Sequence, residues 1–245
     1  MPHFLISSNS ITEDIIKVSE KDLYNHLAKA LRIKQGERLM FIDENEIQYI
    51  TKVEKITSSE IYTKVVDSYK SKRKLDLDIT LAQSVLKPDA QFSSIQKATE
   101  LGVKNILPLI TDNTAVKENM IKNKQEKWQK IALESVKQCE RADIPAVMPD
   151  STLEKALNDK TYDYKIAFVE KDAESSLQEH LKKIKPDTAK KFLVIIGPEG
   201  GFSDREFELL SRYNIPKITL GNLIYRADTA AVVALASLIY GLQDG

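Results

Sequence analysis

The sequence contains little cysteine and histidine and no excess of charge of either sign. Of its 245 residues, 1 is cysteine and 3 are histidine, and the 36 Lys and Arg residues equal the 36 Asp and Glu residues. The single Cys139 excludes an internal disulfide and a cysteine-rich metal site, and it is typical of a cytoplasmic protein. The histidines lack ligand spacing, so we predict no metal site. Because the charge is balanced, any nucleic-acid site must come from local basic clusters.

Long apolar runs and the common nucleotide-binding motifs are also absent. The amino terminus lacks a basic region followed by a long apolar stretch, so we expect no signal peptide. The most apolar stretch, residues 230–242, is too short to span a bilayer, and we predict no membrane association. Neither Gly-x-Gly-x-x-Gly after a strand, nor Gly-x-x-x-x-Gly-Lys-Ser/Thr, nor Gly-x-Ser-x-Gly occurs. The usual dinucleotide, triphosphate and serine-hydrolase sites are therefore disfavoured, and a ligand would be of another kind.

The first 72 residues show the pattern of a small β-rich domain. Short runs of apolar and β-branched residues, separated by polar turns, predict the strands of a small β-barrel. These runs are residues 39–42, 48–53 and 60–66. The dense basic run 70–74 follows where this pattern stops, and it is either a phosphate-contacting edge or a solvated linker. The basic candidates for RNA binding in this region are Arg32, Lys34, Lys72 and Arg73.

From residue 73 to residue 245 the pattern alternates strand and helix. Such alternation predicts a mainly parallel sheet that helices cover on both faces. The expected strands are residues 78–83, 106–110, 145–148, 165–169, 192–196 and 217–220. A helix is expected from Pro88 to a left-handed C-cap at Gly102, and an amphipathic helix is expected over 124–138.

Two junctions between strand and turn lie about twenty residues apart near the carboxyl end. The first, Gly197-Pro198-Glu199-Gly200-Gly201, follows a run of five apolar residues, and Ser203 with Glu206 then forms a capping box for the next helix. At the second, a short strand ends in Gly221, and Asp228-Thr229 is expected to cap the last helix. Loops at the carboxyl ends of parallel strands bind ligands in α/β proteins. The alternative is that both loops are ordinary connections.

One charged residue, Arg226, stands between an apolar loop and an apolar helix. An unpaired guanidinium is costly to remove from water, so Arg226 either pairs with Asp228 or Glu199 or faces a ligand that carries negative charge. The sequence leaves both alternatives open.

Read together, the motifs resemble the RsmE family of SPOUT-class methyltransferases, which methylate uracil N3 in small-subunit ribosomal RNA with S-adenosylmethionine. The resemblance runs along nearly the whole chain in six blocks. The blocks are 26–32 with Gly36, 96–103 with Pro108, 128–132 with Glu134, Gln138 with Arg141 and Pro145, 196–201, and 220–221 with Arg226 and 229–230.

The resemblance implies an α/β fold in two domains. Residues 1–72 would form a PUA-like β-barrel that binds RNA, and residues 73–245 a SPOUT domain whose parallel sheet ends in a trefoil knot. It also implies a homodimer that acts on 16S ribosomal RNA or the small ribosomal subunit, with the knot region at the interface. A knot would not be expected from general rules.

By the same resemblance, the two glycine loops form the pocket for S-adenosylmethionine. The implied cofactor-binding residues are Ile196, Gly197, Gly201, Leu220, Gly221, Asn222, Leu223, Ile224, Tyr225 and Thr229. Arg141 joins the candidate RNA-binding residues. Two positions depart from the family pattern. The family has Leu-Arg-Thr-Glu-Thr where this chain has 225–229, and it carries Glu-Arg near 112–114, where this chain has no arginine.

The chemistry of N3 methylation requires loss of the imide proton. We predict that Arg226 stabilises the resulting anion. Glu199 and Asp228 are candidates for the general base that takes this proton. The alternative for each is a purely structural role, in a turn or at a helix start. Two other functions stay open: an RNA-binding or ribosome-binding protein of this fold without catalysis, and a SPOUT methyltransferase acting on another RNA.

Overall fold

The chain forms two compact units. The computed structural model describes residues 3–116, 121, 124–182, 184 and 191–242. The first unit comprises 1–74 together with 136–143, and the second comprises 75–135 and 144–245. The two units thus divide two residues after the expected boundary, and one short segment from later in the chain joins the first. Among the described residues, no helix has the length and apolarity needed to cross a membrane.

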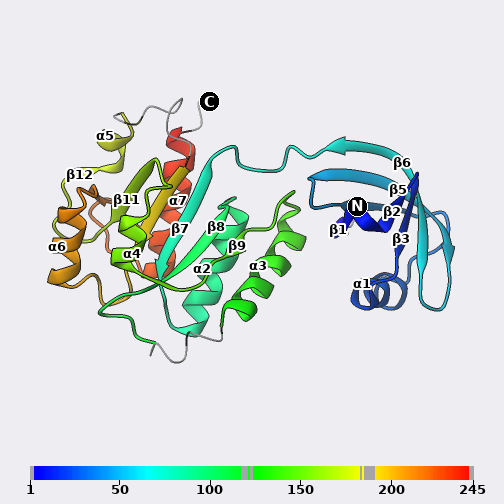
Figure 1. The fold of residues 1–245 in the computed structure, drawn as a ribbon, viewed down its shortest axis with the longest axis horizontal. Coiled ribbons are helices and arrows are strands. Elements are labelled where there is room, and N and C mark those ends of the chain that lie inside the picture. Colours follow the sequence, from blue (N-terminus) through cyan, green and yellow to red (C-terminus); the bar gives the residue numbers. More distant parts are fainter. Residues whose placement is uncertain (1–2, 117–120, 122–123, 183, 185–190, 243–245) are drawn as a thin grey trace. The chain divides into compact units, whose positions relative to one another are not determined.

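The first unit is built on a mixed sheet of six strands (Figure 1). The strands are β1 (His3–Leu5), β2 (Ile11–Thr12), β3 (Ile15–Val18), β4 (Arg38–Ile42), β5 (Ile47–Ile56) and β6 (Ile61–Lys70). Their order is β1-β4-β5-β6-β3-β2, and only β1 and β4 run parallel. Phe41, Ile16 and Ile61 are fully buried in its core. Alternation predicted β4 to β6, whereas β2 and β3 are too short to give a clear pattern.

A short helical segment packs on this sheet. It consists of α1 (Lys21–Asn25) and a π-helical turn over His26–Ala30, and Leu27 anchors it in the core with no exposed surface. The segment ends at Arg32, which has a φ of 51° although it is not a glycine. A π-turn and a residue in the left-handed region are both uncommon and concentrate at functional sites.

The second unit contains an all-parallel sheet of eight strands. They are β7 (Asp78–Ser84), β8 (Asn105–Ile110), β9 (Ala146–Val147), β10 (Ser151–Thr152), β11 (Tyr164–Phe168), β12 (Ser175–Ser176), β13 (Lys191–Ile196) and β14 (Lys217–Thr219). The main path is β10-β8-β7-β13-β11-β14-β12, and β9 pairs with β8. The predicted parallel sheet is confirmed, and β13 lies between two strands that precede it in the chain.

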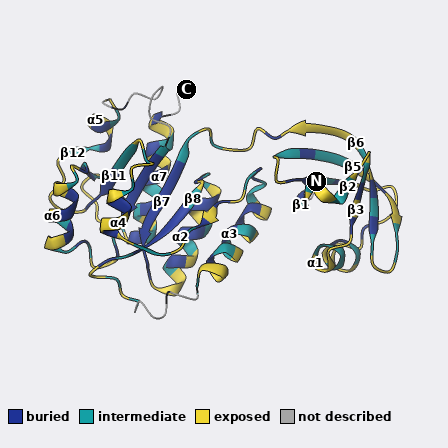
Figure 2. Cartoon of the chain, in the orientation of Figure 1, coloured by how far each residue is buried: buried dark blue, intermediate teal, exposed yellow. Residues whose placement is uncertain are grey.

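Helices cover both faces of this sheet, as the alternation predicts (Figure 1). The helices are α2 (Pro88–Glu100), α3 (Gln125–Cys139), α4 (Leu153–Asn158), α5 (Leu177–Leu181), α6 (Asp204–Arg212) and α7 (Ala227–Leu242). Along β13, Phe192 and Val194 join the apolar cluster that includes α2 and α7, whereas Leu193 joins the cluster that includes α4 and α6. Every residue from Phe192 to Ile196 is at most 2% exposed, and Figure 2 shows the buried centre of the sheet.

The helix boundaries agree with the sequence at most places. Gly102 has a φ of 91° after α2, and the capping box of Ser203 and Glu206 is present at α6. The last helix differs, because α7 begins at Ala227 and the N–H of Ala230 donates to the carbonyl of Arg226. The expectation that Asp228 and Thr229 cap this helix is therefore wrong: both lie in its first turn.

Candidate functional site

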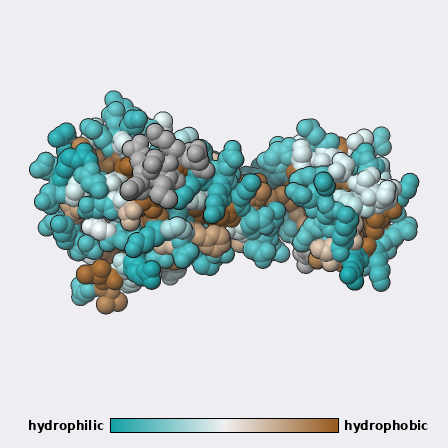
Figure 3. Space-filling view, turned by 90° about the horizontal axis from the view of Figure 1, so that it is seen from below, coloured by the Kyte–Doolittle hydropathy of each residue, from teal (hydrophilic) through white to brown (hydrophobic). Residues whose placement is uncertain are grey.

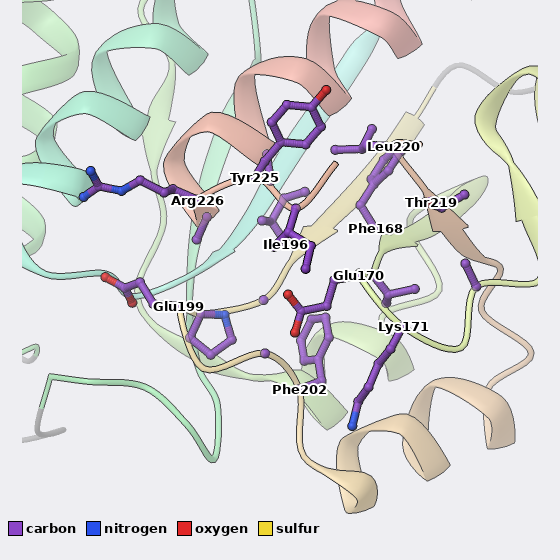
Figure 4. Close-up of a pocket in the computed structure, with 18 of the residues that line it drawn as sticks. Phe168, Glu170, Lys171, Ile196, Glu199, Phe202, Thr219, Leu220, Tyr225 and Arg226 are labelled. Carbon is purple, nitrogen blue, oxygen red and sulfur yellow. The ribbon is translucent and has the colours of Figure 1, made fainter. Parts of the chain in front are cut away.

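Three loops meet at the carboxyl ends of neighbouring strands and enclose a cavity of about 880 Å³ (Figure 4). The loops follow β11, β13 and β14, and β11 lies between the other two strands in the sheet. The cavity is lined by nine of the ten predicted cofactor residues and by both predicted catalytic residues. These are Ile196, Gly197, Gly201, Leu220, Gly221, Asn222, Leu223, Ile224, Tyr225, Glu199 and Arg226. Thr229 is not among the lining residues, because it lies on the exposed side of α7.

Sequence reasoning missed the loop after β11. Phe168, Val169, Glu170, Lys171 and Ala173 line the cavity, although no glycine or motif marks this stretch. The feature of the sequence that could have indicated this loop is the pair of charged residues Glu170 and Lys171, which directly follows an apolar strand. Its importance depends on the strand order, because β11 pairs with both β13 and β14 and so brings its loop between the two glycine loops.

The first glycine loop is a tight turn over Gly197–Gly201. Gly201 has a φ of 70°, and its N–H donates to the carbonyl of Pro198 at 3.0 Å. A Cβ on Gly197 would lie 3.2 Å from the ring of Phe202, so the backbone here passes close to an aromatic wall. The positive φ favours glycine at Gly201, and a side chain at Gly197 would crowd the Phe202 ring.

A buried glutamine fixes the start of this turn. Gln83, at the end of β7, has no exposed surface, and its Nε2 donates to the carbonyls of Gly197 and Ser84 at 3.2 Å each. Its Oε1 is 3.5 Å from the Ser94 hydroxyl, which donates to it. A buried amide with partners on both sides holds the turn to the neighbouring strand.

A second set of contacts holds the other end of the turn. We call residues 111–114, which follow β8, the latch. The Nδ2 of Asn113 donates to the carbonyls of Gly201 at 3.0 Å and of Gly200 at 3.3 Å. Asp112 accepts hydrogen bonds from Arg205 and from the Ser203 hydroxyl, and these bonds hold the pKa of Asp112 below its usual range. The latch occupies the place where the family pattern carries an arginine that this chain lacks.

The latch contributes a testable prediction. Replacing Asn113 with Asp puts a carboxylate oxygen against two carbonyl oxygens, so we expect the Gly200–Gly201 backbone to shift and ligand affinity at the cavity to fall roughly tenfold, by the loss of about one to two hydrogen bonds. Isothermal titration with S-adenosylmethionine measures the effect. Asn158→Asp, on the exposed end of α4, is the matched control and should leave affinity unchanged. Equal affinities for the two variants would contradict the assigned role of the latch.

The second glycine loop is open where the first is crowded. Gly221 has a φ of 110°, and a Cβ placed on it would meet no atom within 4 Å. The N–H of Gly221 donates to the Thr219 hydroxyl at 3.1 Å, and that hydroxyl is also 3.0 Å from the Gly221 carbonyl. Farther along the same loop, after Asn222, Leu223 and Ile224 are 70% and 80% exposed. An apolar pair this exposed next to a cavity marks a surface that another molecule can cover.

The two predicted catalytic residues lie at the margin of the cavity (Figure 4). The side chain of Arg226 is exposed and forms no hydrogen bond or ion pair with any described residue, Asp228 and Glu199 included. Of the two alternatives for Arg226, the pairing with Asp228 or Glu199 is not formed, and the exposed guanidinium is open to water or to a ligand at the margin of the cavity. Glu199 accepts a hydrogen bond at 3.3 Å from the N–H of Lys87, the N-cap residue of α2, so one of its oxygens contacts the start of that helix.

The structure separates the predicted RNA-binding residues into two groups. Arg32, Lys34 and Lys72 are exposed and form no ion pair within the described part of the chain. Arg73 forms an ion pair with Glu140, and Arg141 is 5% exposed and donates twice to Asp143. Arg141 is thus buried in an ion pair with Asp143, and the sequence did not indicate this because burial depends on the packing of segments distant in the chain.

The described residues contain no group of three or more His, Cys, Asp or Glu side chains that is arranged to hold a metal ion.

Comparisons with known families match both units. Residues 73–239 match the family described as an RNA methyltransferase domain, and residues 19–66 match the family described as an RNA methyltransferase PUA domain. Two curated relatives carry the name ribosomal RNA small subunit methyltransferase E. The protein from Aquifex aeolicus is 32% identical over 85% of this chain and 87% of its own length. The protein from Buchnera aphidicola is 31% identical over 87% of this chain and 83% of its own length.

Solved structures resemble the whole chain. A protein from Legionella pneumophila, solved in complex with the bound cofactor SAM, has a TM-score of 0.82 and 26% identity and covers 97% of this chain and 96% of its own. A ribosomal RNA small subunit methyltransferase E from Neisseria gonorrhoeae, bound to S-adenosyl methionine, has a TM-score of 0.83 at 23% identity over 97% of this chain and 96% of its own. The likeness extends over both units.

Proposed function

We propose, because this chain belongs to the ribosomal RNA small subunit methyltransferase E family, that it transfers a methyl group from S-adenosylmethionine to N3 of a uridine in 16S ribosomal RNA. The observation that carries the proposal is the cavity between the three loops, which lies within the matched methyltransferase domain.

The residues of the cavity fit this cofactor. A volume of about 880 Å³ is in the range of small-molecule sites, and apolar side chains of Phe168, Ile196 and Leu220 provide a surface for an adenine ring. The glycine loops bring backbone N–H and C=O groups to the cavity without side chains in the way, which suits a ligand held mainly through the backbone. S-adenosylmethionine supplies an electrophilic methyl group.

Arg226 acts on the base in this proposal. Loss of the N3 proton leaves negative charge that is shared with the O2 and O4 atoms of the uracil. A guanidinium beside either oxygen stabilises that charge, and Arg226 has its donors free of other described partners. Because the pair of electrons on N3 then forms the new bond to carbon, alignment of N3 with the methyl group supplies much of the rate.

Glu199 is the candidate that accepts the N3 proton. Its carboxylate lies at the same margin of the cavity as Arg226 and carries a single hydrogen bond, from the Lys87 N–H, so one oxygen stays available. Glu199 would take the proton from N3 first, and the electron pair left on N3 would then form the bond to the methyl carbon as the bond between that carbon and sulfur breaks. Asp228, inside the first turn of α7, is less suited to this role.

The first unit supplies the contacts with RNA in the proposal. It matches the PUA domain of RNA methyltransferases, and it displays the exposed cations Arg32, Lys34 and Lys72. The unusual backbone at Arg32 turns the chain directly after the π-helical segment. Contacts of this kind with phosphates position an RNA without reading its sequence.

We also propose that the protein acts as a homodimer. Figure 3 shows apolar side chains projecting from one face of the second unit. The large apolar residues with at least 70% exposure in this unit are Leu223, Ile224 and Tyr240, on the second glycine loop and on α7. A second copy that covers them would also border the cavity. The trefoil knot implied by the family resemblance stays a prediction.

Mass mapping of 16S ribosomal RNA tests the proposed function. We expect a strain that lacks this gene to have lost one methyl group from one uridine, and the purified protein with S-adenosylmethionine to restore it on isolated small subunits. Restoration on another RNA alone would support the alternative methyltransferase. Binding to subunits without any methyl transfer, and without cofactor binding by calorimetry, would support the RNA-binding protein without catalysis.

A further inference from the structure

Glu170 is an acidic residue of the cavity that the proposed mechanism does not use. It lies two residues beyond the end of β11, and it is exposed to the cavity. Within the described part of the chain it forms no hydrogen bond and no ion pair. The neighbouring Lys171 does not neutralise it, because its ammonium lies over the Phe207 ring at 5.3 Å and 3.9 Å from Asp204.

The Glu170 carboxylate lies against the first glycine turn. Oε1 of Glu170 lies 3.1 Å from the point that a Cβ on Gly201 would occupy, so the absence of a side chain at Gly201 leaves the room for it. Figure 4 shows the carboxylate between Ile196 and Phe202, on the side of the glycine turn. Glu170 is exposed and has no described protein partner, so both oxygens of its carboxylate are available to accept hydrogen bonds from a ligand in the cavity.

We propose that Glu170 accepts hydrogen bonds from the ribose hydroxyls of the bound cofactor, an inference that rests on the proposed function. Dinucleotide-binding α/β folds of the Rossmann type, whose motif this chain lacks, offer a parallel: an acidic residue at the end of a strand beside the glycine-bearing strand accepts from the ribose, and here β11 is the neighbour of β13. Two vicinal hydroxyls match the two oxygens of one carboxylate. Arg226 and Glu199, which act on the base, belong to another part of the cavity wall, so the adenosyl half of the cofactor is the part that faces Glu170.

Calorimetry with two ligands tests this assignment. S-adenosylmethionine carries both the ribose and an amino-acid group, whereas 5′-methylthioadenosine carries the ribose without the amino-acid group. We expect Glu170→Gln to weaken both ligands by about tenfold, because charged hydrogen bonds become neutral ones. Glu170→Asp, which keeps the charge and shortens the reach, should give an intermediate loss. Asp172→Asn removes a carboxylate from the same loop at a position that does not line the cavity, and it should change neither affinity.

The remaining outcomes overturn the inference in distinguishable ways. Weaker binding of S-adenosylmethionine with unchanged binding of 5′-methylthioadenosine would assign Glu170 to the amino-acid group. Equal losses in Glu170→Gln and Asp172→Asn would indicate a general effect of charge. Unchanged affinities in Glu170→Gln would leave it without a role in binding. If the unaltered protein bound neither ligand, the proposed function itself would fail.

Discussion

Arg226→Ala is expected to abolish most methyl transfer while the protein still binds S-adenosylmethionine. The guanidinium is the only part of this residue that the proposed chemistry uses, and removal of one group that stabilises a developing anion costs about a hundredfold to a thousandfold in turnover. Arg226 pairs with no described residue, so its loss leaves no buried partner unsatisfied and should not destabilise the fold. Transfer of labelled methyl groups to unmethylated small subunits measures turnover, and calorimetry measures cofactor affinity.

Two further variants make this result specific. Arg226→Lys keeps the charge but loses the planar fork of donors, so we expect partial recovery of turnover. Arg212→Ala removes an exposed arginine from the end of α6, away from the cavity lining, and should retain full turnover. Undiminished methylation by Arg226→Ala would refute the catalytic assignment. A matched loss of cofactor affinity would instead make Arg226 a binding residue.

Ile224→Asp is expected to convert a dimer into monomers and to reduce methylation with it. Ile224 is 80% exposed, and a symmetric interface would bury it twice. Burial of such a side chain contributes about 1.5–3 kcal/mol, so placing a charge at both copies should raise the dissociation constant by more than roughly a hundredfold. Sedimentation equilibrium measures the mass, which for the unaltered protein should be twice that of the 27.7 kDa chain.

The matched control is an exposed apolar residue of the first unit. Val66, on β6, is 57% exposed, and Val66→Asp should leave the dimer and the methylation rate as they are. A monomeric unaltered protein with full activity would overturn the proposed assembly. A dimeric Ile224→Asp variant would show that the interface lies on another surface.

Much of the fold follows from local patterns in the sequence. β13 is predicted because five apolar residues in a row suit a strand buried on both faces, and the capping box at Ser203 is local chemistry that needs no tertiary information. The strands β2, β9, β10 and β12 have two residues each, which is too short for an alternation of apolar and polar residues to be recognised. The start of α7 was misplaced because Asp228 suits a helix cap and the first turn of a helix equally well.

The sequence predicted the two glycine loops that line the cavity and missed the third loop, which follows β11. Gly201 and Gly221 could be identified from the sequence, because turns that need a positive φ favour glycine and both residues adopt one. Glu170 could not be identified, because its role depends on β11 lying between β13 and β14, and strand order is a long-range property. The burial of Arg141 beside Asp143 could not be predicted for a similar reason, because basic character does not show which side chains the fold buries, and its role in RNA binding stays a prediction.

The insertion of β13 between β7 and β11 has a consequence for how the protein is made. During synthesis, β7 leaves the ribosome long before β13 and β11 leaves it shortly before, and each lacks this neighbour until β13 arrives. Pairing of β7 with a strand so distant in the chain is slow, and the edge that β7 leaves open in the meantime invites association with other chains. Competence to take up a methyl donor is therefore acquired last, after nearly the whole polypeptide has been translated.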